Sequence, residues 1–214
     1  MIDRTESTLE LPEAIASDVA AVRSAVPAGF IDAQAHRGDV WVRVHRESIV
    51  EALQCLRDQV TPGYRFFSEC VGVDYLDPKT GQLIMGREER FEIIYNLAAF
   101  VPSSEGVGAV RRIFVAVSAP EADPTVPSVT ELFAGASFPE REIYDMFGIR
   151  FQGHPDLRRL LMSDDWIGHP QRKDYPLGGE RVRFPAEMTG PSINDRLVQH
   201  PGESFFGPTA EEFE

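Results

Sequence analysis

The sequence is poor in cysteine and has no long apolar run. Its two cysteines, Cys55 and Cys70, form no CxxC motif, so this chain alone can build neither a disulfide framework nor a four-thiolate cluster. No apolar run approaches the roughly 20 residues that a bilayer-spanning helix needs, and residues 1–10 lack the apolar core of a signal peptide. We expect an intracellular protein that is soluble or held at a membrane by its partners.

Basic residues are also scarce, since 21 Lys and Arg stand against 34 Asp and Glu and the net charge is −13. Such a chain lacks the clustered positive charge that nucleic-acid binding requires. The acidity is uneven: residues 137–177 hold six basic and seven acidic residues, a net charge of −1, and the rest of the chain carries −12. This balance favours ion pairs within the protein or between subunits over the capture of an anion.

Hydrophobic residues make up 43% of the 214 positions, enough for a substantial core in one large or two small domains. Apolar residues recur at helical spacing in some stretches and alternate in others. The pattern predicts four strands, at residues 40–45, 65–74, 90–101 and 110–118. It predicts helices at residues 11–26, 46–60 and 128–134, and one more that begins at Ser137.

This order of elements predicts an α+β fold, in which helices cover one face of a mixed or antiparallel sheet, followed by an extended C-terminal segment. Residues 1–136 would form the α+β domain, and residues 137–177 a segment of short helix, turns and extended chain. Residues 178–214 would form an extended tail. The tail is rich in Gly and Pro and its phenylalanines are irregularly spaced, which favours docking of these aromatic side chains on another surface.

Residues 137–177 are denser in Arg, Asp, His, Pro, Gly and aromatic residues than the sequence on either side. Ser137 and Glu140 match the capping box that begins a helix, and Gly148 is a typical residue to end it. After the helix, the triplet Gly-His-Pro occurs twice and is followed each time by basic residues, at 153–155 and at 168–170. We expect this segment to carry the function of the chain.

The histidines of the two triplets, His154 and His169, invite a metal-binding or acid–base interpretation, with several aspartates nearby as further ligands. Zinc-type sites usually show histidines at helical i, i+4 spacing or cysteine partners. Each of these histidines lies instead between Gly and Pro, where a structural role in a turn is favoured. The sequence therefore predicts no catalytic and no metal-ligating residue.

The basic residues that follow the triplets are Arg158, Arg159, Arg172 and Lys173. They could cradle a phosphate, but no glycine-rich strand–turn–helix motif surrounds them. Asp156 and Asp174 are close in sequence, so ion pairing is favoured. Trp166 and Tyr175 could stack on these guanidinium groups or fill part of the core, and the sequence leaves both alternatives open.

The run from Glu140 to Leu177, EREIYDMFGIRFQGHPDLRRLLMSDDWIGHPQRKDYPL, resembles the signature of the C subunit, or 30-kilodalton subunit, of respiratory complex I, the proton-pumping NADH:quinone oxidoreductase. Upstream, RFEIIYNL at residues 90–97 is similar to the strand that precedes this signature in the family. Two positions depart from the family pattern: Phe138 stands where Trp is frequent, and Gln171 where Leu is frequent. The short sequence after the signature favours a separate C subunit over a fusion with the D subunit.

The resemblance implies a peripheral-arm subunit on the cytoplasmic side of a bacterial cell membrane, next to the D subunit and near subunits B and I. It implies no cofactor on this chain, whereas partner subunits carry the FMN and iron–sulfur clusters that pass electrons from NADH to quinone as protons are translocated. Contact with the membrane would be indirect, through the complex. Eight residues become candidates for subunit contacts: Arg158, Arg159, Arg172, Lys173, His154, His169, Trp166 and Tyr175.

Two other functions stay open at this point. Related hydrogenase and dehydrogenase complexes contain equivalent cofactor-free scaffold subunits, and this chain alone does not name the electron donor. A stand-alone metal-dependent hydrolase would use His154 and His169 with nearby aspartates. Stoichiometric zinc, iron or manganese in the isolated protein would favour the hydrolase.

Overall fold

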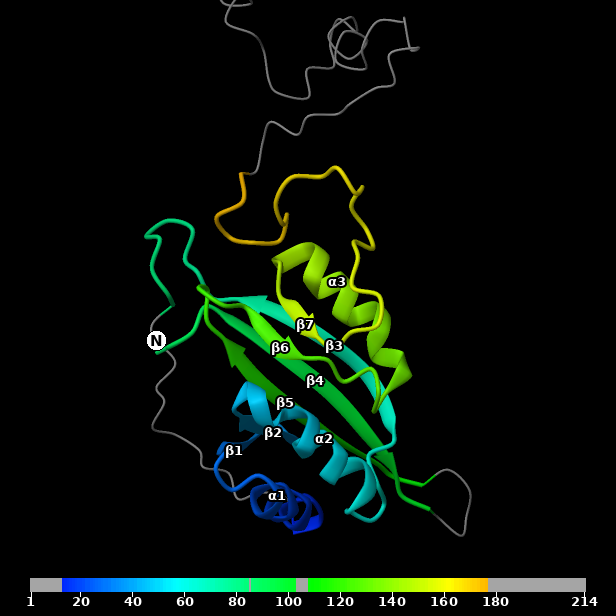
Figure 1. Ribbon diagram of the computed structural model, residues 1–214. Helices are drawn as coiled ribbons and strands as arrows, with labels where there is room; N and C mark the ends of the chain where they lie inside the picture. The colour runs from blue at the N-terminus through cyan, green and yellow to red at the C-terminus, as the bar shows by residue number, and fades with distance from the viewer. Residues whose placement is uncertain (1–12, 85, 103–107, 177–214) are drawn as a thin grey trace, which may run out of the picture. The chain divides into compact units, whose positions relative to one another are not determined.

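The computed structural model describes residues 13–84, 86–102 and 108–176 (Figure 1). The helices are α1 (Glu13–Ala25), α2 (Ile49–Asp58) and α3 (Ser137–Phe147), with short 3-10 helices η1 (Arg46–Ser48) and η2 (Ala134–Ala136). The strands of the main sheet are β1 (Phe30–His36), β2 (Asp39–Val44), β3 (Phe66–Asp74), β4 (Phe91–Phe100) and β5 (Val110–Ala119). A smaller sheet pairs β6 (Thr125–Pro127) with β7 (Arg150–Gln152). The extended tail predicted for residues 178–214 lies outside the described residues.

The main sheet has the strand order β1-β2-β5-β4-β3. Strands β2 and β5 run parallel, and the other neighbouring pairs are antiparallel. The α+β class and the mixed sheet are therefore confirmed. Within the described ranges, no helix is both long enough and apolar enough to cross a membrane.

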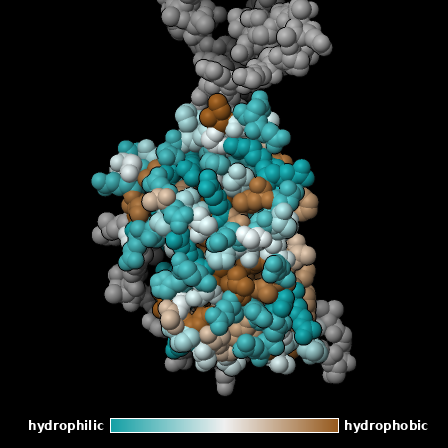
Figure 2. All heavy atoms as spheres, in the orientation of Figure 1, coloured by the Kyte–Doolittle hydropathy of each residue, from teal (hydrophilic) through white to brown (hydrophobic). Residues whose placement is uncertain are grey.

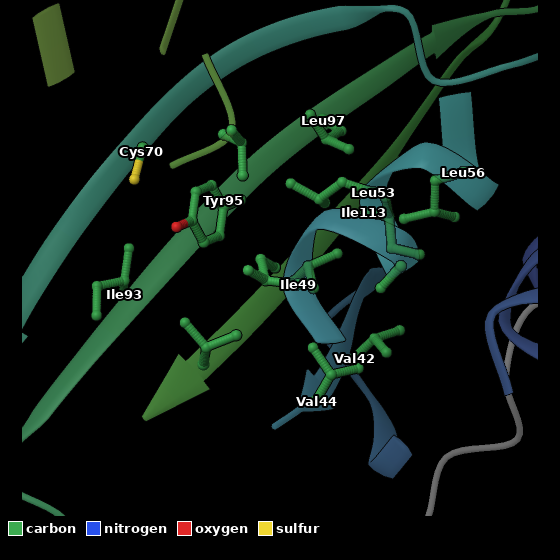
Figure 3. Close-up of a cluster of buried hydrophobic side chains, with 14 of the residues drawn as sticks. Val42, Val44, Ile49, Leu53, Leu56, Cys70, Ile93, Tyr95, Leu97 and Ile113 are labelled. Atoms are coloured by element: carbon green, nitrogen blue, oxygen red, sulfur yellow. The ribbon is translucent and has the colours of Figure 1, made fainter. Parts of the chain in front are cut away.

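The hydrophobic core lies between the main sheet and the helices (Figure 3). Helix α2 directs Ile49, Leu53 and Leu56 at the sheet, where Tyr95 of β4 and Ile113 of β5 meet them. All five side chains are fully buried. The three residues of α2 recur at spacings of four and three, so one face of the helix is apolar and its burial fixes the helix on the sheet.

Helix α3 lies beside β3 (Figure 1). A glycine allows the close approach, because a Cβ atom at Gly72 would lie 2.9 Å from the ring of Phe147 and 3.2 Å from Ile143. The helix ends at Gly148 as predicted, with φ of 75° in the left-handed region. The chain then enters β7 and continues into residues 153–176, which contain no helix or strand and are called the loop 153–176 below.

Three strands and one helix differ from the sequence prediction. The prediction lacks β1, because its polar residues Asp32, Gln34 and His36 alternate with alanines and the apolar contrast is weak. It also lacks β6 and β7, which have only three residues each and are too short for a periodic pattern. Residues 128–134 form turns and the first residue of η2, so the short helix predicted there is wrong.

The predicted capping box is also wrong. Ser137 is the first residue inside α3, Ala136 is the N-cap, and no side chain caps the helix there. The carboxylate of Glu140 is fully buried and accepts hydrogen bonds from Ser128 Oγ (2.6 Å) and from the Val129 N–H (2.8 Å). These two donors from the preceding turn hold the acid inside the protein, so it does not cap the helix.

Candidate functional site

Asp145, in the last turns of α3, organises the start of the loop 153–176. Its buried carboxylate accepts hydrogen bonds from the main-chain N–H groups of Leu160 (3.0 Å), Leu161 (2.8 Å) and Met162 (2.8 Å) on one oxygen. The other oxygen accepts one from Arg159 Nη1 at 2.6 Å. Burial raises the pKa of Asp145, but the hydrogen bonds from Met162 and Arg159 lower it more, and the pKa lies below its ordinary value. The carboxylate therefore stays ionised at neutral pH and fixes the loop.

Arg159 closes the loop on itself. Besides its ion pair with Asp145, the guanidinium donates to the main-chain carbonyls of Trp166 (3.0 Å) and Gly168 (2.9 Å). The Arg159 side chain is only 16% exposed. This candidate contact residue is thus engaged inside the chain, where it joins two parts of the loop.

The two candidate histidines contact different parts of α3. His154 Nδ1 accepts a hydrogen bond from the Asp156 N–H (3.0 Å), which leaves Nε2–H to donate to the Ser137 carbonyl (3.1 Å). His169 donates from Nδ1 to the Asp145 carbonyl (2.9 Å), and burial lowers its pKa. The two carbonyls are eight residues apart, about 12 Å along a helix, so the histidines do not meet. The described part of the chain has no group of three His, Cys, Asp or Glu side chains that could hold a metal ion.

A second charged network, with Arg90 and Asp74 buried at its centre, ties the end of the loop to the sheet. Arg90, 2% exposed, precedes β4 and pairs with Asp74 (2.8 Å), Asp174 (2.7 Å) and Glu121. Asp74 also accepts the main-chain N–H of Lys173 at 2.9 Å. Burial raises the pKa of Asp74, but Arg90 and the Lys173 amide lower it below its ordinary value. The Asp74 carboxylate therefore stays ionised at neutral pH, and its contacts with Arg90 and the Lys173 amide anchor residues 173–174.

Arg172 holds the same part of the loop against the end of α3. Its Nε donates to the Phe147 carbonyl at 2.6 Å, and its guanidinium lies 5.3 Å from the centroid of the Phe91 ring. A Cβ atom at Gly148 would lie 2.6 Å from the ring of His169 and 2.8 Å from Arg172 Nη2. Glycine is therefore required at residue 148 both for the backbone conformation and for space.

The other candidate residues are less enclosed. The side chain of Arg158 is 69% exposed and pairs with Asp156, itself 57% exposed, at 2.9 Å. Lys173 is exposed, whereas Trp166 and Tyr175 are half-buried. Among the described residues, neither of these two rings lies within cation–π distance of an arginine. Of the two alternatives that the sequence leaves open for Trp166 and Tyr175, stacking on the arginines of this segment is thus absent from the described chain.

Three charged residues hold the loop in place, of which sequence reasoning missed Asp74 and Arg90 and considered Asp145 only as a further metal ligand beside the histidines. Asp74 ends the apolar strand β3, Arg90 directly precedes β4, and Asp145 stands between Tyr144 and Met146 in α3. A charged residue at a position that the apolar pattern assigns to the core is a signal for a buried ion pair. The apolar periodicity does not give this signal in α3, where Ile143, Met146 and Phe147 form the apolar face and Asp145 lies on the opposite side of the helix.

Comparison with known proteins identifies the family. Residues 42–181 match the family model described as "Respiratory-chain NADH dehydrogenase, 30 Kd subunit". The C subunit of the NADH-quinone oxidoreductase of Roseiflexus castenholzii is 44% identical over 182 residues, which cover 85% of this chain and 92% of that protein. The NADH-quinone oxidoreductase subunit 5 of Thermus thermophilus is 44% identical over 150 residues, 69% of this chain and 66% of that protein.

A solved structure of the membrane-bound sulfane sulfur reductase, described as an archaeal respiratory membrane complex, contains a chain with the same fold. The TM-score is 0.58, and the match covers 76% of this chain and 85% of the other. At 19% identity this likeness shows the fold alone. The family match includes α3, both charged networks and the whole loop 153–176. The chain therefore belongs to the family of the 30-kilodalton subunit of the respiratory-chain NADH dehydrogenase.

Proposed function

We propose that this chain is a structural subunit in the peripheral arm of a bacterial NADH:quinone oxidoreductase and has no catalytic centre of its own. It holds neighbouring redox subunits in register, so that electrons pass from NADH through FMN and iron–sulfur clusters on those subunits to quinone. Proton translocation is coupled to this transfer in the assembled enzyme. Family membership and the names of two similar proteins support the assignment to this complex.

The observation that carries the structural role is that two charged residues in the body of the protein, Asp145 and Arg90, are fully engaged in holding the loop. The Asp145 carboxylate is occupied by three amides and a guanidinium, and Arg90 is occupied by three carboxylates. Groups engaged in this way brace the main chain, and a fully connected polar network makes an irregular loop rigid. A rigid loop of defined shape suits a surface that positions a neighbouring protein.

In this proposal the D subunit is the direct neighbour, with subunits B and I close by, on the cytoplasmic side of the cell membrane. Membrane contact is only indirect, through the complex. Among the charged candidate residues, Arg158 and Lys173 are exposed and can contact a neighbour directly. Arg159 and Arg172 act through the loop that they hold.

Purification of a tagged chain from detergent-solubilised membranes tests the proposal. We expect the tagged chain to be recovered in a large assembly that shows flavin and iron–sulfur absorption and contains subunits D, B and I. The isolated chain should show no visible absorption. Recovery of the chain only as a free protein, without cofactor-bearing partners, would contradict the proposal. A different electron-input module in the assembly would point to a related dehydrogenase or hydrogenase.

A further inference from the structure

The loop 153–176 and the start of α3 expose apolar side chains. Phe138 is 63% exposed, Leu161 61% and Ile167 85%, and these are the three most exposed large apolar residues in the described chain. We call these three residues the apolar patch. Figure 2 shows hydrophobic surface on the loop that lies beyond α3. Apolar side chains held in water at one place mark an interaction site.

One charged network places the patch residues on the same part of the surface. The Leu161 N–H is bound to Asp145, and Arg159 is bound to the same carboxylate. Arg159 also reaches the carbonyls on either side of Ile167, those of residues 166 and 168. Phe138 precedes Asp145 by seven residues, which are about two helical turns, so both lie on the same side of α3.

Arg141 borders the patch with positive charge. Its guanidinium lies 5.6 Å from the centroid of the Phe138 ring and donates to the carbonyls of Arg158 (3.2 Å) and Arg159 (3.0 Å). No described carboxylate forms an ion pair with Arg141, and the only described ion pair of Arg158 is with the exposed Asp156. A partner that brings carboxylates here would therefore gain favourable contacts.

We infer that the apolar patch is the contact surface for a neighbouring protein subunit whose matching surface is apolar and carries carboxylates opposite Arg141 and Arg158. The inference rests on the proposed function, which supplies the assembly. A second copy of this chain fits less well, because each copy has a net charge of −13 and the two would repel. The loop is fixed before binding, so the contact costs little conformational entropy.

An aspartate placed in the patch tests the inference. Ile167→Asp would bury an unpaired carboxylate in the contact, and Ile84→Asp is the matched control because Ile84 is an isoleucine 50% exposed outside the patch. Each full-length variant replaces the native copy in the host, and the membrane complex is purified. We expect Ile167→Asp, and likewise Leu161→Asp, to lower recovery of the chain in the complex about tenfold, and Ile84→Asp less than about twofold. Each isolated variant should melt within about 2 °C of the unmodified chain, because the changed side chains are exposed.

Thiol labelling examines the same contact in the assembled enzyme. The native Cys55 and Cys70 are 0% and 6% exposed, so a charged maleimide reports on an introduced surface cysteine. We expect Ile167→Cys to be labelled in the isolated chain and protected in the purified complex. Ile84→Cys should be labelled in both.

The outcomes separate this inference from the proposed function. Equal recovery of Ile167→Asp and Ile84→Asp, or free labelling of Ile167→Cys in the complex, overturns the inference while the chain is still shown to belong to the assembly. If the unmodified chain is not recovered in a cofactor-bearing membrane complex, the proposed function fails and the inference fails with it.

Discussion

The sheet with its helices and the loop 153–176 are held together in different ways. The sheet and helices are fixed by fully buried apolar side chains such as Leu53, Tyr95 and Ile113 (Figure 3). No residue of the loop is fully buried. Its main chain is fixed by charged groups, Asp145 near its start and Arg90 near its end, that lie in the body of the protein.

The difference explains how an irregular loop can be rigid and still expose apolar side chains. Hydrophobic burial has no preferred direction and would pull Leu161 and Ile167 inward. Leu157 and Met162 of the loop pack in part against the core. Hydrogen bonds to a buried carboxylate are directional and act on the main chain, so they fix the loop while Leu161 and Ile167 stay exposed. The loop can therefore offer these side chains to another protein.

The largest loss of stability is expected for a substitution in the apolar core. Leu53→Ala removes a fully buried side chain from α2, and we expect a loss of about 2–5 kcal/mol in the free energy of unfolding because a cavity remains. Urea denaturation of the isolated chain measures it. Leu161→Ala is the control, since Leu161 is 61% exposed and its loss should cost less than about 0.5 kcal/mol. Similar losses for the two variants would contradict the core described here.

The free energy of unfolding should depend on pH through Glu140, which is buried in the core. Burial raises its pKa to about 7 from an ordinary value of 4.5, against the hydrogen bonds from Ser128 and Val129. The folded state then binds this proton more tightly than the unfolded state, so the stability from this group is complete below about pH 4.5 and is lost as the pH rises to about 7. The loss is on the order of 3 kcal/mol.

The measurement is the free energy of unfolding of the unmodified chain and of Glu140→Gln between pH 5 and 8. The substituted amide does not ionise, so we expect the variant to lack this contribution and the difference between the two proteins to change with pH. A difference that stays constant over this range would show that the Glu140 carboxyl titrates normally.

Substitution of Asp145 should destabilise the loop 153–176 and leave the core folded. Asp145→Asn removes the charge that holds three amides and Arg159 and leaves an NH2 group facing one set of these donors, and we expect the loop to lose about 2 kcal/mol of local stability. Limited proteolysis should cut the variant within residues 153–176 while the core melts nearly as before. Asp156→Asn, which alters an exposed ion pair, should leave cleavage unchanged.

Substitution of Gly148 tests how closely the loop 153–176 packs against the end of α3. Gly148→Ala strains a residue with φ of 75° and also pushes against His169 and Arg172. Gly38→Ala is the matched control, because Gly38 has φ of 89° and open space where the Cβ atom would lie. We expect both to be less stable by about 1 kcal/mol from backbone strain, and Gly148→Ala to lose about 1 kcal/mol more because the loop must shift. Equal losses would mean that the loop does not press on Gly148.

The sequence predicts the core better than the loop, for a physical reason. Helix α2 buries one apolar face, and strands β4 and β5 carry buried apolar residues along most of their length, so the pattern that predicts these elements is local in the sequence. Strand β1 escapes prediction because alanines supply its inward positions. The end of α3 is predicted because Gly148 adopts a conformation that favours glycine.

The conformation of the loop has no comparable local pattern. Asp145 meets Leu160 and Arg159 across 15 and 14 residues, and Arg90 meets Asp174 across 84. Charge composition indicates that ion pairs form in this segment, but it does not say which acid meets which base. Glu140 shows the same limit, because an acid in the first turn of a helix fits both a capping box and a buried site.

Hydrogen exchange in the isolated chain tests most directly whether the loop is braced by this chain itself. The amides of Leu160, Leu161 and Met162 donate to Asp145 although the loop has no regular secondary structure. We expect them to exchange at least about a hundredfold more slowly than unprotected peptide amides, and to lose most of this protection in Asp145→Asn. Exchange of these amides at the unprotected rate in the isolated, folded chain would contradict the account, because the loop would then acquire its shape only from its neighbours.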